Sequence, residues 1–128
     1  MDVLIYTTVS DDRRAELEEL VRKAAPGVGI ATYGTVEALS SRLQQPISER
    51  SISVLYPSTR SDLLDIMAIR HLLRDLRIIL IAPDQDGETI AMAHQLRPRY
   101  LGYVSGDFGG LHAVLGKIIA ARRAGTED

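Results

Sequence analysis

Residues 77–83 read Arg77-Ile78-Ile79-Leu80-Ile81-Ala82-Pro83, a run of five apolar residues that ends at a proline. A strand with one face in water alternates polar and apolar residues. An unbroken apolar run of this length instead predicts a strand covered on both faces, as in a parallel sheet flanked by helices. We therefore interpret 78–82 as the central strand of an α/β sheet.

Four other segments have the length and composition of strands, and helical patterns follow each of the five. The additional strands are predicted at Val3–Tyr6, Ile30–Tyr33, Ile52–Tyr56 and Tyr100–Val104. The helices are predicted after Asp11 and Asp12, from Thr35 to Pro46, from Asp62 to about Leu76 with Ser61 as its N-cap, from Gly87 to Arg97, and through Leu111, Val114, Leu115 and Ile118. This alternation predicts right-handed crossovers and a three-layer, doubly wound sheet with the flavodoxin-like order 2-1-3-4-5.

Length and composition set the class of protein. The 128 residues suit one domain, predicted at 1–123, followed by a polar tail at 124–128. The chain has no cysteine, which excludes disulfides and thiolate metal sites and suits a reducing cytoplasm. The net charge of -2 provides no general attraction to nucleic acid, and no apolar segment is long enough to span a membrane. We expect a cytoplasmic protein whose partners are proteins or small molecules.

Ligands and chemistry in such a sheet collect beyond the carboxyl ends of the strands, near the reversal between the first and third strands. The residues predicted to line this crevice are Thr7, Thr8, Tyr56, Pro57, Ser58, Ala82, Pro83, Asp84, Ser105 and Gly106. They are mostly neutral, so the crevice is predicted to perform little chemistry.

With this layout, the chain resembles the response-regulator receiver family over nearly its whole length. Besides the five-unit layout, the most specific feature is the segment from Tyr103 to Phe108. It is similar to the family's fifth-strand pattern of aromatic, aliphatic, variable residue, lysine, proline and phenylalanine. The resemblance implies a role in signalling, and it places the family's aromatic switch residue at Tyr103.

The residues with which a receiver accepts a phosphoryl group are not retained. The matching positions hold Thr7 and Thr8 in place of the acidic pair, Tyr56 or Pro57 in place of the phosphoacceptor aspartate, Ala82 in place of the serine or threonine, and Gly106 or Ser105 in place of the lysine. Magnesium needs carboxylate ligands, and a transferring phosphoryl group needs cations around it. The resemblance therefore implies a degenerate pseudo-receiver with no cofactor, no metal and no catalytic residues.

The same edge admits other interpretations. Thr7, Thr8 and Ser10 before a helix could form a phosphate cradle, although Asp11 and Asp12 would repel the anion there and are more simply helix caps. Asp84, Asp86 and Asp107 could form an adventitious cation site, whereas loop aspartates before helices usually act as caps. His71, His94 and His112 fall on three different helices without a second ligand at suitable spacing, and we expect them to face solvent.

Two groups of residues are candidates for contact with a partner. Leu63, Leu64 and Met67 widen the apolar stripe of the third helix, either as well-covered core or as an interface, and Leu64 and Met67 are the candidate contact residues. Arg97 and Arg99, with Arg122 and Arg123, could form a basic rim beside Tyr103, or could simply complement helix C-termini.

The leading hypothesis is a non-catalytic receiver-like module that binds another protein, or a second copy of itself, independently of phosphorylation. The alternative is a small-molecule or nucleotide-binding flavodoxin-like domain that uses Thr7, Thr8, Tyr56 and Ser58.

Overall fold

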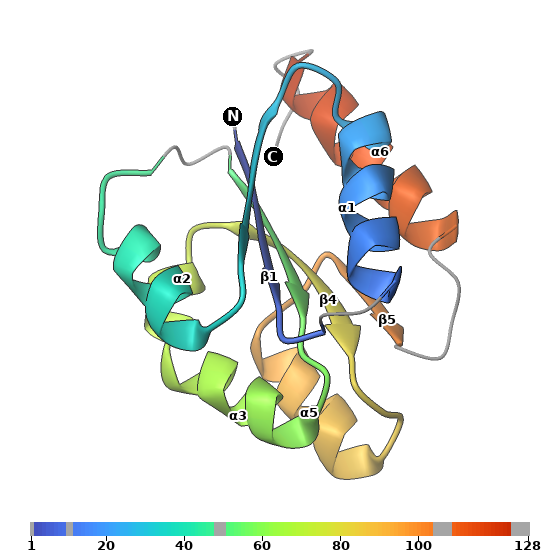
Figure 1. The fold of residues 1–128 in the computed structure, drawn as a ribbon. Coiled ribbons are helices and arrows are strands. Elements are labelled where there is room, and N and C mark those ends of the chain that lie inside the picture. The colour runs from blue at the N-terminus through green and yellow to red at the C-terminus, as the bar shows by residue number, and fades with distance from the viewer. Residues whose placement is uncertain (1, 10–11, 48–50, 104–108, 124–128) are drawn as a thin grey trace.

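The computed structural model describes residues 2–9, 12–47, 51–103 and 109–123. Its centre is a parallel sheet of five strands in the order β2-β1-β3-β4-β5, which confirms the predicted topology (Figure 1). The strands are β1 (Asp2–Thr7), β2 (Gly29–Tyr33), β3 (Ile52–Tyr56), β4 (Arg77–Ala82) and β5 (Tyr100–Tyr103). Val104, the last residue predicted for the fifth strand, lies outside the described residues.

Helices cover both faces of the sheet (Figure 1). They are α1 (Asp12–Ala24), α2 (Val36–Leu43), α3 (Arg60–Ala68), α4 (Arg70–Leu73), α5 (Gly87–Gln95) and α6 (Gly109–Arg123). One core lies between the sheet and the pair α1 and α6, where Leu17, Val21, Leu111 and Leu115 are buried. The second core lies under α2, α3, α4 and α5, where Leu39, Leu63, Leu73 and Ala93 are buried.

The interior strands are as apolar as the sequence predicted. Every residue of β3 and every residue of β4 except Arg77 is buried. Along β4, Ile79 and Ile81 face the core under α1 and α6, whereas Ile78 and Leu80 face the other core. Alternate side chains thus fill opposite layers, which is why the run 78–82 contains no polar residue.

The third predicted helix differs from the expectation at both ends. It begins at Arg60 rather than Asp62, because the side chain of Thr59, not Ser61, accepts the Asp62 N–H at 3.1 Å as the N-cap. It is interrupted at Ile69, whose φ of -111° and ψ of 18° are not helical, so that α4 is a separate short helix. No proline or glycine marks this break in the sequence.

The apolar residues predicted to widen the face of this helix differ in exposure. Leu63 and Met67 are buried, at 0% and 8% exposure, whereas Leu64 is 52% exposed. Met67 therefore belongs to the core, which supports the simpler of the two interpretations for that residue. Leu64 remains available for contact.

Tyr100 fixes how closely α6 approaches β5. A Cβ atom added at Gly110 would lie 2.7 Å from the Tyr100 hydroxyl oxygen, and one added at Gly102 would lie 3.1 Å from Cε2 of the same ring. Gly116, further along α6, has no heavy atom within 4 Å of such a position. With a larger residue at Gly110, the Tyr100 side chain would have to shift away from the first turn of α6.

This contrast gives a matched pair of variants. Gly116→Ala should raise the free energy of unfolding by about 0.5–1 kcal/mol, because alanine removes the entropic cost of a helical glycine. Gly110→Ala should fail to stabilise the protein or should destabilise it, since its methyl group collides with Tyr100. Urea unfolding of both variants, with and without Tyr100→Phe, tests this. Equal stabilisation by the two alanines would contradict the packing described.

Candidate functional site

The carboxyl ends of β1, β3 and β4 meet at one edge of the sheet, where the sequence placed its candidate crevice. Thr7, Tyr56 and Ala82 end these strands, and all three are buried. Thr7 Oγ1 accepts the Val9 N–H at 3.0 Å, so its hydroxyl is used in shaping the following turn. The exposed groups at this edge come instead from the next residues along the chain.

Thr8, Ser58 and Asp62 form a compact polar network beyond β1 and β3. Oγ1 of Thr8 lies 2.8 Å from Oδ2 of Asp62, and Oγ of Ser58 lies 3.0 Å from the same oxygen. The two hydroxyl oxygens are 2.9 Å apart, and Thr8 Oγ1 also accepts the Ser58 backbone N–H at 2.9 Å. Because each hydroxyl carries one hydrogen, both donate to the carboxylate.

These bonds set the charge of the carboxylate. Partial burial acts to raise the pKa of Asp62, but hydrogen bonds from Thr8, Ser58 and Thr59 outweigh it and hold the pKa below the ordinary value. The hydroxyls of Thr8 and Ser58, which the alternative hypothesis assigned to a small molecule or nucleotide, therefore already donate to a fixed negative charge. Such a charge would repel a phosphate group.

Two tyrosines complete the buried side of this edge. Tyr56 stands at the position of the phosphoacceptor in the resemblance and is 1% exposed. Its hydroxyl accepts a long hydrogen bond of 3.5 Å from Nε of Arg13. Burial, reinforced by the negative charge of Asp62, raises the pKa of Tyr6 to about 12. Neither phenol is placed as an activated nucleophile.

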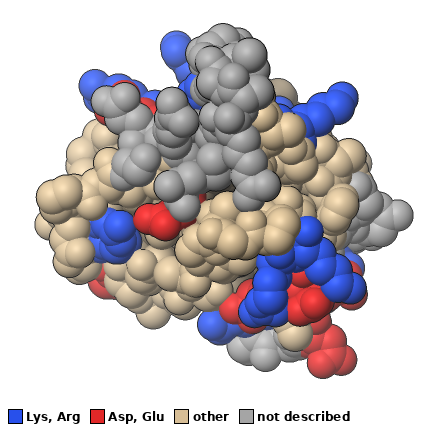
Figure 2. Space-filling view, turned by 90° about the horizontal axis from the view of Figure 1, so that it is seen from above, with Lys and Arg blue, Asp and Glu red and all other residues tan. Residues whose placement is uncertain are grey.

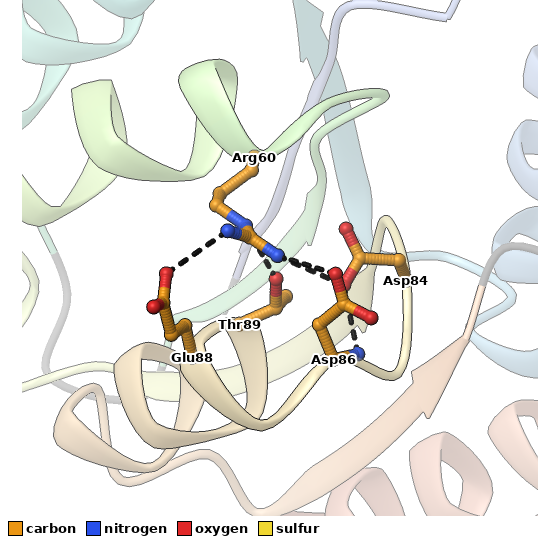
Figure 3. Close-up of polar contacts among 5 residues, drawn as sticks. All are labelled: Arg60, Asp84, Asp86, Glu88 and Thr89. Carbon is orange, nitrogen blue, oxygen red and sulfur yellow. Dashed lines mark hydrogen bonds and ion pairs between the residues drawn. The ribbon is translucent and has the colours of Figure 1, made fainter.

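Arg60 connects the start of α3 to the start of α5 (Figure 3). Its Nη2 lies 2.6 Å from Oδ2 of Asp86, its Nη1 lies 3.1 Å from Oε2 of Glu88, and its Nε donates to Oγ1 of Thr89 at 2.9 Å. Thr89 is fully buried, whereas the two carboxylates are exposed. We call this set, with Asp84, the Arg60 cluster.

Asp84 supports the cluster from the end of β4. Its Oδ1 accepts the Asp86 N–H at 3.0 Å and lies 3.9 Å from Nη2 of Arg60. The hydroxyl of Thr89 donates to this carboxylate, and that hydrogen bond, followed by the Asp86 N–H and the charge of Arg60, lowers the pKa of Asp84. The loop from β4 to α5 is thus held by one cation.

Several predicted features need correction. Asp86 stands at the N-cap of α5 but makes no side-chain capping bond, because its carboxylate binds Arg60. Arg97 and Arg99 precede β5, whereas Tyr103 ends it, about 13 Å further along at 3.3 Å per residue. The basic rim predicted beside Tyr103 is therefore wrong for these two arginines.

Other predicted residues behave as expected or fall outside the description. His71, His94 and His112 are exposed, and no cluster of three or more metal-ligating side chains occurs within 2–9, 12–47, 51–103 and 109–123. Ser105, Gly106, Asp107 and Phe108, with Ser10 and Asp11, lie outside the described residues. Pro57 is buried beside Tyr56, and Ser58 is exposed.

One residue of the site, Asp62, could have been recognised from the sequence. Thr59-Arg60-Ser61-Asp62 has the spacing of a capping box, in which the acidic residue returns a bond to the cap. Asp62 does accept the Thr59 N–H, besides serving Thr8 and Ser58. Arg60 and Arg13 carried no such signal, because their partners are distant in sequence.

The face of the molecule in Figure 2 has no large patch of residues of a single charge. Figure 2 views the edge that carries the amino ends of the strands, and its basic and acidic residues form small groups separated by uncharged surface. Among the described residues, no helix is both long and apolar enough to cross a membrane.

Comparison with solved structures relates this chain to receiver-like proteins. A response regulator receiver protein from Pseudoalteromonas atlantica superposes with a TM-score of 0.68 at 18% identity, covering 94% of this chain and 98% of the other. A pilus assembly-related protein from Burkholderia pseudomallei gives 0.66 at 17% identity over 100% and 92%. A pilus assembly protein from Burkholderia thailandensis gives 0.61 at 19% identity over 99% of both chains.

No protein-family model matches the chain, and no curated protein sequence matches it significantly. At these identities the structural neighbours show the fold, which is receiver-like. Function has to be argued from the site.

Asp62 should make stability depend on acid. Its pKa is lowered on folding, so its contribution is present above the unfolded value of about 3.9 and is lost as the pH falls through the folded value. Asp62→Asn should be less stable than wild type at pH 7 but should lose less stability between pH 5 and pH 2. Urea unfolding across this range measures the effect. Asp65→Asn, an exposed neighbour without these hydroxyl partners, should follow the wild-type curve.

Removal of the Arg60 guanidinium should loosen the loop from β4 to α5. We expect Arg60→Gln to lower the free energy of unfolding by about 1 kcal/mol, since it removes three exposed ion pairs and leaves the buried Thr89 hydroxyl without the donor it has in Arg60. The difference should shrink in 1 M salt. Arg14→Gln is the control, because Arg14 is equally exposed but its ion pair with Glu18 is long, at 3.9 Å. Hydrogen exchange at residues 84–89 should accelerate only in Arg60→Gln.

Proposed function

We propose that this protein is a receiver-like signalling module that has lost phosphoryl chemistry and acts by binding another protein, without catalysis. The observation that carries the proposal is the hydrogen bonding at the edge of the sheet where the carboxyl ends of β1, β3 and β4 meet. There, Asp62 is the carboxylate bonded to Thr8 and Ser58, and it is held by hydroxyl groups rather than left open to a metal.

The chemistry of the strand ends supports the absence of phosphoryl transfer. Thr7, Tyr56 and Ala82 are neutral and buried, so none of them offers a carboxylate acceptor or a magnesium ligand. Asp62, a carboxylate at this edge, has a lowered pKa and accepts several hydrogen bonds, which make it a weaker nucleophile. Arg60, the cation at this edge, is already engaged by Asp86 and Glu88.

The Arg60 cluster supports independence from phosphorylation in a second way. A module switched by a phosphoryl group needs a loop that changes state when the group arrives. Here the loop from β4 to α5 is pinned to α3 by a cation that belongs to the chain. These contacts therefore favour one position of the loop without any phosphoryl group.

The descriptions of the structural neighbours are consistent with a role in signalling or assembly. One is described as a response regulator receiver protein and two as pilus assembly proteins. By analogy, this chain would work inside a signalling or assembly complex in the cytoplasm. The candidate contact residues on the surface are Leu64, Tyr103, Arg97 and Arg99, whereas Met67 is only 8% exposed and lies in the core.

The protein should be inert toward phosphodonors. Incubation with magnesium and acetyl phosphate should leave its intact mass unchanged, and beryllium fluoride should leave its amide spectrum unchanged, because no acceptor is paired with a metal site. A receiver that retains its phosphoacceptor aspartate is the positive control. A phosphoryl mass addition that disappears in Asp62→Asn would identify Asp62 as an acceptor and would contradict the proposal.

A further inference from the structure

A groove of about 680 Å³ lies at the edge of the sheet that carries the amino ends of the strands, opposite the edge with their carboxyl ends. Its walls come from α3 and α4 on one side and from the end of α5 on the other, and the start of β4 closes its base. The apolar residues of the groove are Met67, Leu73, Leu76, Ile78 and Leu96, each no more than 8% exposed. The base is therefore well-packed core rather than a deep cavity.

Three arginines stand around this apolar base. Arg70 and Arg74 are four residues apart on the wall formed by α4, and Arg97 stands on the opposite wall, after α5. All three are exposed, and none has a carboxylate within ion-pair distance among the described residues. In a chain of net charge -2, this is a local excess of positive charge.

Leu64 extends the apolar part of the groove. It precedes Met67 by three residues and Ala68 by four on the same helix, so the three side chains share one face. Met67 and Ala68 line the groove, and Leu64 is 52% exposed beside them. An occupant can thus place apolar side chains over Leu64 and the groove while its edges face the arginines.

Arg97 occupies a backbone position that favours glycine. Its φ is 52°, and it follows the C-cap residue Leu96, where a left-handed residue ends many helices. Glycine adopts this conformation without steric cost, whereas arginine does not. Replacement of Arg97 by glycine therefore removes the side chain while relieving the backbone, so its effect on binding can be separated from any loss of stability.

We propose that this groove binds an acidic amphipathic segment of a partner protein, with apolar side chains over Leu64 and Met67 and carboxylates toward Arg70, Arg74 and Arg97. Charge complementarity favours this occupant, because the two walls carry cations and the base is apolar, as in helix-in-groove recognition. The inference rests on the proposed function and assigns its partner surface.

The energetics predict a transient, salt-sensitive complex. The groove residues are already nearly covered, so Leu64 is the main apolar surface left to bury. The three arginines then act chiefly on the rate of association and on its salt dependence. Reversal of the charges at Arg70 and Arg74 should weaken binding roughly tenfold or more, because it removes two exposed ion pairs and places like charges against the occupant.

The test uses a photo-crosslinking amino acid in place of Leu64, in the full chain, in lysate of the native cell. Mass spectrometry should identify a crosslinked segment that is acidic and amphipathic. That segment, made as a peptide, should bind the wild-type chain saturably and shift the amides of residues 64–74 and 95–97. An Arg70→Glu/Arg74→Glu variant should bind it at least tenfold more weakly.

Two further variants separate binding from folding. Lys23→Glu/Lys117→Glu makes the same change in net charge on exposed positions of α1 and α6, and it should bind like wild type. Arg97→Gly should be at least as stable as wild type, because it relieves the left-handed backbone, yet it should bind more weakly. Binding that survives the charge reversals in the groove would overturn the inference.

The outcomes distinguish this inference from the proposed function. A protein captured equally by the wild type and by the groove variants would overturn the groove but retain the function. No captured protein at all would count against both. A crosslink to a second copy of this chain would replace the proposed occupant, as would shifts of the groove amides by inorganic phosphate alone at a similar concentration.

Discussion

The structure depends on a sheet that is buried on both faces. Every residue of β3 and all but the first of β4 are inaccessible, and alternate side chains fill two separate cores. No side chain in the middle of these strands can therefore take part in binding. Polar groups that could act on a ligand or partner are confined to the two edges where strands meet loops. At the carboxyl edge Arg60 is paired with carboxylates, whereas at the amino edge three arginines have no such partner among the described residues.

One helix start organises the carboxyl edge. Within four residues, Thr59 caps α3, Arg60 reaches the loop from β4 to α5, and Asp62 binds the hydroxyls that follow β1 and β3. The ends of β1, β3 and β4 are consequently tied together through a single turn of helix. The side chains that could have formed a ligand site bind one another, and the carboxylates near Arg60 and at Asp62 leave an excess of negative charge at this edge.

The sequence predicted the fold better than the site, for a physical reason. Periodicity and apolar runs are local, so the run 78–82 and the βα alternation were enough to predict the order of the strands. Polar contacts join distant segments: Arg60 meets Asp86 from 26 residues away, and Thr8 meets Asp62 from 54. The spacing of residues does not encode such pairs. The break at Ile69 also escaped prediction, since no proline or glycine marks it.

Arginine has two different environments in this fold, and the difference decides where association can gain free energy. Arg60 is surrounded by Asp84, Asp86 and Glu88, so an incoming anion would have to compete with three carboxylates. Arg70, Arg74 and Arg97 border one groove without such partners among the described residues, and their like charges repel one another across it. An acidic occupant relieves that repulsion and leaves the core intact. A contact with an anionic partner is therefore favourable at the amino-terminal edge and unfavourable at the carboxyl edge, where this fold usually keeps its chemistry.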